Sequence, residues 1–444
     1  MVVESIKRKE LIFPLILGVI LSFLYYNMTL EYFSVVLLGV LGIALILFDI
    51  RVGIYMEIFL YPFLPDMLNL LFMIFIVGVY VFNIVFKKVK PLTKSSIIMP
   101  IILYIIFITI NTVTSNDPVG SFRDLAIHLT SIGFIFVLIQ SIKSKKDFNI
   151  LIVLLIISAT LTALYGLYQF ATGNIVMEDK WVDEATNPDL QTRIYSVFGN
   201  PNIFAEYLIM IIPISVGLFW FSKSIHKKAL FLITTMILVL ALVLTMSRGG
   251  WIGFAFGIFV FILFVEKRLL LLAIPAAIGG LFLLPDAILN RLLSILNFAD
   301  SSNDYRIRMW KFTLEVIKDN WLVGVGFGHL PFRQAFGKYT RTMVTYHAHN
   351  TYLETMAEMG LLGFVVFISL LFVIFKYAIK KLVKGNDKYT KIISSGILSG
   401  LAAVLVHGLV ENILYIPRII ISFWMLVGLI ITLINITKEP QRIS

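Results

Sequence analysis

Residues 229–265 read ALFLITTMILVLALVLTMSRGGWIGFAFGIFVFILFV, and this stretch decides the class of fold. Two apolar runs, 229–246 and 250–265, are separated only by a short polar turn that carries Arg248. A helix needs roughly 20 mostly apolar residues to cross a bilayer, and each run approaches that length. The stretch therefore predicts two membrane-spanning helices joined by a tight turn.

The rest of the chain repeats this pattern. Of its 444 residues, 59% are hydrophobic and only 14% are charged, a composition typical of membrane proteins with many spans. We predict an all-α polytopic membrane protein with about 12–14 transmembrane helices. The region 53–86 is expected to form two of these segments. Because no internal repeat or low-complexity linker interrupts the chain, residues 1–444 are predicted to form a single integral membrane domain.

The distribution of lysine and arginine predicts how the chain is oriented. Basic loops alternate with loops that contain few lysines, and cytoplasmic loops are usually the basic ones. Both termini are then cytoplasmic, and the net charge of +11 reflects these loops rather than binding of nucleic acid. The outer face receives an external loop at 171–200, the turn at Arg248, a large external loop at 285–349 and the turn at 411–418. The chain has no cysteine, which excludes disulfides and thiolate metal sites.

The loop 285–349 is too long to be a plain connection and is expected to contain structure of its own. Asp304 is suited to cap a helix, and the apolar residues that follow it recur at helical spacing. These residues are Ile307, Trp310, Leu314 and Ile317. We predict an amphipathic helix that lies at the membrane interface with this apolar stripe towards the lipid.

Three arginines are candidates for binding an anion. Arg248 lies so close to hydrocarbon that it must either snorkel to the interface or meet an anion. Arg306 and Arg308 share one helix but lie about 200° apart around it, so only one of them can face a given ligand. A guanidinium suits a diphosphate because it donates two parallel hydrogen bonds and stays charged. A solvated basic face is the alternative for the second arginine.

Two histidines are candidates for catalysis. His347 and His349 are two residues apart, which in a helix would direct them to opposite sides. Zinc would prefer histidines four residues apart and a third ligand, and the spacing of Glu354 and Glu358 matches no zinc motif, so we expect no metal. An imidazole at the mouth of a membrane helix suits a general base, although a lone histidine is more often structural.

Two further polar groups adjoin predicted spans. Asn200, Pro201 and Asn202 follow Arg193 and open one span, where helix capping explains most of the pattern. Near the outer end of a later span lie His407, Glu411 and Asn412, which are candidates for a functional site or for pairing with Arg418.

The order of these motifs resembles the O-antigen ligase and polymerase superfamily, whose members are membrane glycosyltransferases acting on polyprenyl-diphosphate-linked glycans. The motifs are GNPN at 199–202, SRGGW at 247–251, R-x-R-x-W at 306–310 running into DNWLVGVGFG at 319–328, and HAHNTYLE at 347–354 followed by EMGLLG at 358–363. The resemblance covers roughly residues 190–435, the predicted ligase-like core.

The resemblance implies a GT-C-like helical fold and an inverting transfer that needs neither a metal nor a cofactor. It assigns the role of catalytic base to His349, with His347 as the alternative. The substrate-binding residues that it implies are Arg193, Asn202, Arg248, one of Arg306 and Arg308, Asn350 and Glu411. Glu411 departs from the family, which often has aspartate at that position.

The partners implied are an undecaprenyl-diphosphate-linked glycan as donor, a glycan, lipid-linked or protein acceptor, and membrane lipids. The enzyme is expected in the bacterial cytoplasmic membrane, with its active site on the external face. The motifs do not separate a ligase from a polymerase. A transporter or flippase for polyprenyl-linked glycans is the alternative outside the enzyme class.

Overall fold

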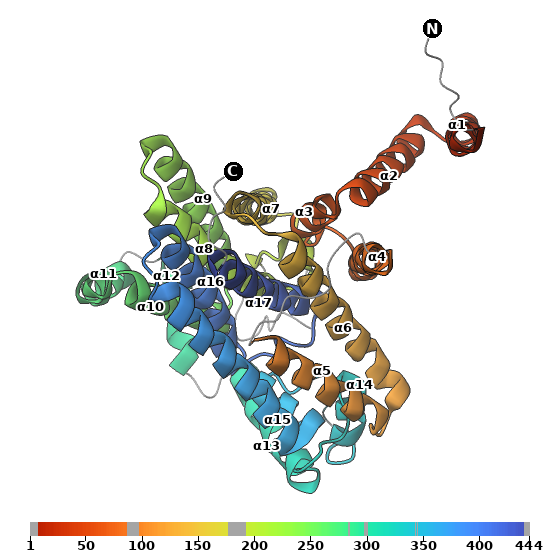
Figure 1. Ribbon diagram of the computed structural model, residues 1–444. Helices are drawn as coiled ribbons and strands as arrows, with labels where there is room; N and C mark the ends of the chain where they lie inside the picture. Colours follow the sequence, from red (N-terminus) through yellow and green to blue (C-terminus); the bar gives the residue numbers. More distant parts are fainter. Residues whose placement is uncertain are drawn as a thin grey trace. The chain divides into compact units, whose positions relative to one another are not determined.

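The computed structural model describes residues 8–86, 97–175, 192–282, 285–296, 301–341, 343 and 345–438. These residues form helices joined by turns and loops, and none of them belongs to a strand (Figure 1). The predicted all-α fold is confirmed. The α-helices are α1 Arg8–Asn27, α2 Leu30–Phe48, α3 Ile50–Leu60, α4 Asp66–Val85, α5 Ile98–Val113, α6 Pro118–Ser141, α7 Lys145–Thr172, α8 Pro201–Phe221, α9 Ile225–Leu244, α10 Arg248–Val265, α11 Leu270–Leu281, α12 Asp286–Leu293, α13 Ser301–Asp319, α14 His329–Phe336, α15 Thr351–Ala378, α16 Lys388–His407 and α17 Pro417–Lys438.

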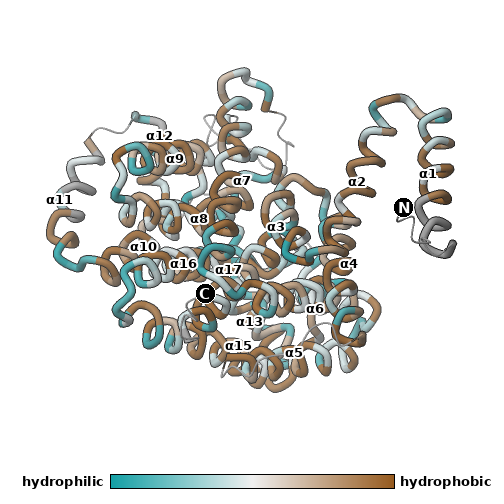
Figure 2. Tube along the Cα trace, turned by 45° about the horizontal axis from the view of Figure 1, so that its top comes forward, coloured by the Kyte–Doolittle hydropathy of each residue, from teal (hydrophilic) through white to brown (hydrophobic). Residues whose placement is uncertain are grey.

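Ten helices of the described chain are long and apolar enough to cross a membrane, so the protein is a multi-pass membrane protein. They are α2, α4, α6 to α10 and α15 to α17. Most of the trace is hydrophobic, and hydrophilic colouring gathers at turns and helix ends (Figure 2). Two apolar runs of the sequence, 53–64 and 269–284, overlap the short helices α3 and α11, with 11 and 12 residues. At about 1.5 Å per residue, helices of this length fall short of a bilayer core of about 30 Å.

The chain forms two compact units, Met1–Met56 and Glu57–Ser444. In the first unit, α1 contacts α2, and most side chains of α2 are exposed. In the second unit, α16 packs against α8 and α10, while α17 packs against α6. The predicted single domain and the core at 190–435 stay predictions.

Small residues bring α8, α10 and α16 close together. A Cβ atom added at Gly400 of α16 would lie 2.1 Å from the carbonyl oxygen of Met210 in α8. One added at Gly253 of α10 would lie 2.8 Å from the carbonyl oxygen of Ala403 in α16. Glycine at such positions allows the backbones of membrane helices to approach. The starts of α8 and α10 and the end of α16 reach a common cavity, and they carry several of the predicted site residues.

The predicted loop 285–349 is partly helical and contains α12, α13 and α14. The helix α13 begins at Ser301, so Asp304 lies within its first turn and is not the cap that the sequence predicted. The predicted apolar stripe is only partly buried, since Ile317 is buried but Leu314 is 52% exposed, and Met309 and Val316 are buried beside Ile317. The buried residues belong to a core shared with α14 and α15. Placement of α13 at the membrane interface stays a prediction.

The predicted external loop 171–200 falls largely on residues 176–191, which lie outside the described residues. Its last part, 192–200, leads into α8 and carries Arg193.

Candidate functional site

A cavity of about 220 Å³ collects most of the predicted binding residues. Five of them line it: Arg193, Asn202, Arg248, Arg306 and Glu411. They come from the segment before α8, from the starts of α8 and α10, from α13 and from the turn after α16. We call this space the arginine cavity. It brings together residues that are separated by more than 200 positions in the chain.

Capping residues fix the helix ends at this cavity. Asn200 precedes α8, and its Oδ1 accepts a hydrogen bond of 2.8 Å from the backbone N–H of Asn202. Ser247 precedes α10, and its Oγ accepts a bond of 3.3 Å from the backbone N–H of Gly250. The capping function predicted for the Asn-Pro-Asn motif is confirmed. Each cap fixes where its helix begins, which places Asn202 of α8 and Arg248 of α10 at the cavity wall.

Four arginines line the arginine cavity: Arg193, Arg248, Arg291 and Arg306. Burial, and then the charges of the other three arginines, lower the pKa of Arg193 to about 9, so this group is still cationic at neutral pH. Bringing like charges together in a buried place costs free energy that a bound anion would offset. The cavity is therefore suited to an anionic ligand.

Arg193 and Arg248 are held in place by neighbouring polar groups. Arg193 donates from Nε to the carbonyl oxygen of Thr245 at 2.8 Å and from Nη2 to Oδ1 of Asn202 at 2.8 Å. Arg248 donates from Nη1 to the carbonyl oxygen of Ser294 at 3.0 Å. With 8% of its surface exposed, Arg248 lies within the protein, which does not fit the snorkelling alternative.

The glycines after Arg248 make room for neighbouring helices. A Cβ added at Gly249 would lie 2.8 Å from Nδ1 of His407, and one added at Gly250 would lie 2.8 Å from Cβ of Ala205. Both distances are shorter than real Cβ contacts allow, so these positions permit the close packing of α10 against α16 and α8.

The two arginines of α13 have different surroundings. The side chain of Arg306 is 19% exposed, and its Nη2 lies 3.9 Å from Oε2 of Glu411. Arg308 is 59% exposed and pairs with Asp304 one turn earlier on the same helix. Because the two side chains point in different directions, Arg306 lines the arginine cavity and Arg308 does not.

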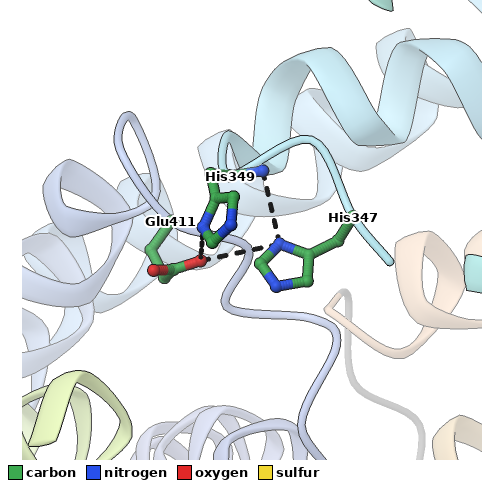
Figure 3. Close-up of side chains that lie close together, drawn as sticks. All are labelled: His347, His349 and Glu411. Atoms are coloured by element: carbon green, nitrogen blue, oxygen red, sulfur yellow. Dashed lines mark hydrogen bonds and ion pairs between the residues drawn. The ribbon is translucent and has the colours of Figure 1, made fainter. Parts of the chain in front are cut away.

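His347, His349 and Glu411 form a compact cluster beside the cavity (Figure 3). Nδ1 of His349 lies 2.6 Å from Oε1 of Glu411, and Nδ1 of His347 lies 3.5 Å from the same oxygen. The prediction that the two imidazoles would point to opposite sides is wrong, because residues 345–350 are not helical. His349 adopts a left-handed φ of 47°. A residue other than glycine in this region is strained and must be held there by its surroundings.

The charged groups of this cluster change one another's pKa values. Burial alone would raise the pKa of Glu411, but His349, His347 and Arg306 outweigh that effect and hold the pKa well below its ordinary value. Glu411 is therefore an anion at neutral pH. Burial, together with the charge of His349, lowers the pKa of His347 to about 3. His347 is consequently a neutral imidazole, and its Nδ1 accepts a bond of 3.3 Å from the backbone N–H of His349.

Neighbouring side chains hold the histidine segment against the turn after α16. Asn350 caps α15 by accepting from the backbone N–H groups of Tyr352 and Leu353, and its Nδ2 donates to the carbonyl oxygen of Leu409 at 2.9 Å. Glu354 accepts from the backbone N–H of Ala348. Asn350, a predicted substrate-binding residue, thus lies behind the histidines rather than in the cavity lining.

Two groups at the site, Arg291 and Ser247, were not predicted as binding residues, and both line the arginine cavity. The cavity lining also includes His407, a candidate from the sequence, whose Nε2 lies 3.1 Å from Oε1 of Glu206. Arg418 pairs with Asp66 at 3.0 Å rather than with Glu411. The amphipathic pattern of 286–293 was the only signal that could have pointed to Arg291.

Comparison with known proteins bears on this site. Residues 233–368 match the family model described as O-antigen ligase. The chain is 22% identical over 342 residues to the teichuronic acid biosynthesis protein TuaE of Bacillus subtilis (strain 168), covering 72% of this chain and 67% of that protein. It is also 30% identical over 192 residues to an uncharacterized protein of Haemophilus influenzae (strain ATCC 51907 / DSM 11121 / KW20 / Rd), covering 38% of this chain and 48% of that protein. These matches confirm the resemblance to the O-antigen ligase and polymerase superfamily.

The O-antigen ligase match contains only part of the site. Arg248, Arg306, His347 and His349 lie within residues 233–368. Arg193, Asn202 and Glu411 lie outside this range but reach the same cavity or cluster. The arrangement of the site therefore depends on helices that flank the matched region.

Proposed function

We propose that this protein is a membrane glycosyltransferase of the O-antigen ligase or polymerase type. It transfers a glycan from an undecaprenyl-diphosphate-linked donor to an acceptor hydroxyl on the outer side of the bacterial cytoplasmic membrane. The observation that carries the proposal is the His349–Glu411 pair beside a cavity lined by four arginines. The family match supports the same class of reaction.

The donor diphosphate occupies the arginine cavity in this mechanism. Arg193, Arg248 and Arg306 bind its oxygens and stabilise the charge that develops on the leaving diphosphate as the glycosidic bond breaks. The helix α10 directs its N-terminus at the same space, and the positive end of a helix dipole also favours an anion. Arg308 is not part of this proposal, since it faces away from the cavity.

His349 acts as the general base. The ionised Glu411 accepts Nδ1–H of His349, which leaves Nε2 free to take the proton of the acceptor hydroxyl as it attacks the anomeric carbon. Attack from the face opposite to the diphosphate inverts the configuration at that carbon. Glu411 also stabilises the imidazolium that forms, as the carboxylate does in a catalytic triad.

The proposal is tested with the purified protein in detergent, a synthetic polyprenyl-diphosphate glycan and a panel of acceptors, with EDTA present. We expect glycan transfer with release of the polyprenyl diphosphate. A ladder of product lengths indicates a polymerase, and a single addition indicates a ligase. If the protein binds the donor and moves it across vesicle membranes without glycosylating any acceptor, the transporter alternative is favoured and the proposal is wrong.

A further inference from the structure

We propose that His347, His349 and Glu411 form a binding site for a transition-metal ion such as Zn²⁺, and that an ion bound there inhibits the enzyme. Among the described residues, these three offer ligand atoms that all lie within 4.8 Å of one another. The binding of the ion follows from this geometry alone. The inhibition rests on the function proposed above.

The positions of the ligand atoms suit a small ion. Zinc lies about 2.0–2.2 Å from nitrogen and oxygen ligands, so a tetrahedral site keeps its ligand atoms on the order of 3.3 Å apart. Nδ1 of His347 and Oε1 of Glu411 already lie 3.5 Å apart. Nδ1 of His349 lies 2.6 Å from the same oxygen, at the distance of a hydrogen bond. An ion that replaces this hydrogen widens the second pair, and it also takes the place of the backbone N–H of His349 that lies 3.3 Å from Nδ1 of His347.

The surroundings of the cluster fix the orientation of the ligands. The ring of His347 packs against Tyr415, with 4.5 Å between the ring centroids and 37° between the ring planes. The second carboxylate oxygen of Glu411 faces Arg306, which leaves Oε1 directed at the two imidazoles. Such supporting contacts strengthen metal sites because they hold the ligands in one geometry.

The chemistry of the ligands indicates which ions would bind. Two imidazoles and one carboxylate suit Zn²⁺, Co²⁺ and Ni²⁺, whereas Mg²⁺ and Ca²⁺ prefer ligand sets made of oxygen. Three protein ligands leave a fourth position open to water or buffer. We therefore expect inhibition by Zn²⁺ at concentrations at which Mg²⁺ has no effect.

Metal binding removes the base without any change in net protonation. In the tautomer of the proposed mechanism Nδ1 of His349 carries the ring hydrogen; a bond forms between the ion and this nitrogen, and its proton moves to Nε2 of the same ring. Nε2 then carries a hydrogen and is no longer able to accept one from the acceptor hydroxyl. The ion also occupies the oxygen of Glu411 that would stabilise the imidazolium.

Binding is tested with Co²⁺, whose visible absorption reports bound ligands, on EDTA-treated full-length protein in detergent without any substrate. We expect a saturable signal that Zn²⁺ displaces. Loss of a group that only supports a metal ligand weakens metal binding by about 10- to 100-fold. His347→Ala and Glu411→Gln remove ligands themselves, so each should weaken Co²⁺ binding by at least this factor. His226→Ala is the matched control, because His226 is exposed at the start of α9, outside the cluster. A wild-type signal no stronger than that of His347→Ala overturns the proposed site.

Inhibition is tested in the transfer assay. Zn²⁺ should inhibit the wild type with the midpoint at which it displaces Co²⁺, and EDTA should restore the rate. The transfer that remains in His347→Ala should be inhibited only at higher Zn²⁺ concentrations. The midpoint of inhibition should rise by the same factor by which this substitution weakens metal binding. Equal sensitivity of the two proteins contradicts inhibition through this site. Absence of transfer in the EDTA-treated wild type would instead count against the proposed function alone, since Co²⁺ binding is measured without substrate.

Discussion

Two groups of charged side chains lie on either side of the segment 408–416 that follows α16, and they have opposite signs. On one side is the arginine cavity, with four arginines around about 220 Å³. On the other is a cavity of about 20 Å³ whose lining includes three carboxylates, Asp124, Glu354 and Glu358. We call the second the acidic pocket. Glu411 belongs to the first cavity, and its neighbour Asn412 belongs to the second.

The two cavities differ in size and in what their charges bind. About 10–15 Å³ holds one water molecule, so the acidic pocket has room for little more than that. Its carboxylates instead bind the chain itself. Asp124 accepts from the backbone N–H of His329 at 2.9 Å and lies 2.7 Å from Nδ1 of the same residue, and Glu354 accepts from Ala348. The arginine cavity has excess positive charge and space for a ligand. This difference supports the proposal that the donor diphosphate occupies the arginine cavity, and it gives the acidic pocket the role of holding the surrounding chain in place.

Among the substitutions that test the difference between the two cavities, Glu411→Gln should have the largest effect on the transfer rate. It removes the negative charge that orients His349 and stabilises the imidazolium, so we expect the transfer rate to fall by about a hundred- to ten-thousand-fold. The rate per folded protein is compared with that of Glu315→Gln, which changes an exposed carboxylate on α13. A rate close to that of this control would remove Glu411 from the mechanism.

Arg306→Gln and Arg308→Gln form a matched pair on one helix. Arg306 lines the arginine cavity, so its loss should lower kcat/KM for the donor by about a hundred- to a thousand-fold, the usual cost of losing one charge-stabilising donor. Arg308 faces away and pairs with Asp304, so its variant should stay near the wild-type rate. Equal losses in the two variants would contradict the assignment of the cavity to the diphosphate.

Asp124→Ala tests the acidic pocket and should have the smallest effect on the transfer rate. It leaves the buried N–H of His329 without its acceptor, which should cost about 1–3 kcal/mol of stability. The thermal midpoint in detergent should fall, while the rate per folded molecule stays within the same order as that of Arg123→Ala, an exposed neighbour on α6. If the rate collapses at an unchanged thermal midpoint, the acidic pocket takes part in the reaction.

Much of the fold could be predicted from the sequence, because a helix that crosses the bilayer must have an apolar run long enough to span its hydrocarbon core. The two apolar runs on either side of Arg248 and the run that follows Asn350 correspond to helices α9, α10 and α15. The capping role of Asn200 could also be predicted, because a helix cap depends only on the local sequence. The angle between Arg306 and Arg308 follows from helix geometry, but only the structure shows which of the two faces the cavity.

Other features depend on contacts that a sequence pattern does not contain. The meeting of His347 and His349 on Glu411 requires the left-handed backbone of His349, and the sequence pattern alone did not indicate that conformation. Arg291 lies in a short helix without a motif, so its approach to the cavity depends on tertiary packing. The helix α13 shares its buried face with α14 and α15, and for that reason the apolar stripe expected to face lipid is partly buried within the protein.

The most direct test of the proposed reaction is the comparison of wild type and His349→Ala for both donor binding and transfer, with EDTA present. We expect the variant to bind the polyprenyl-diphosphate donor nearly as tightly as the wild type, because the arginine cavity is intact. Its transfer rate should fall by about a hundred- to ten-thousand-fold, the usual contribution of a general base. A variant that transfers glycan at the wild-type rate would contradict the assignment of His349 as the base.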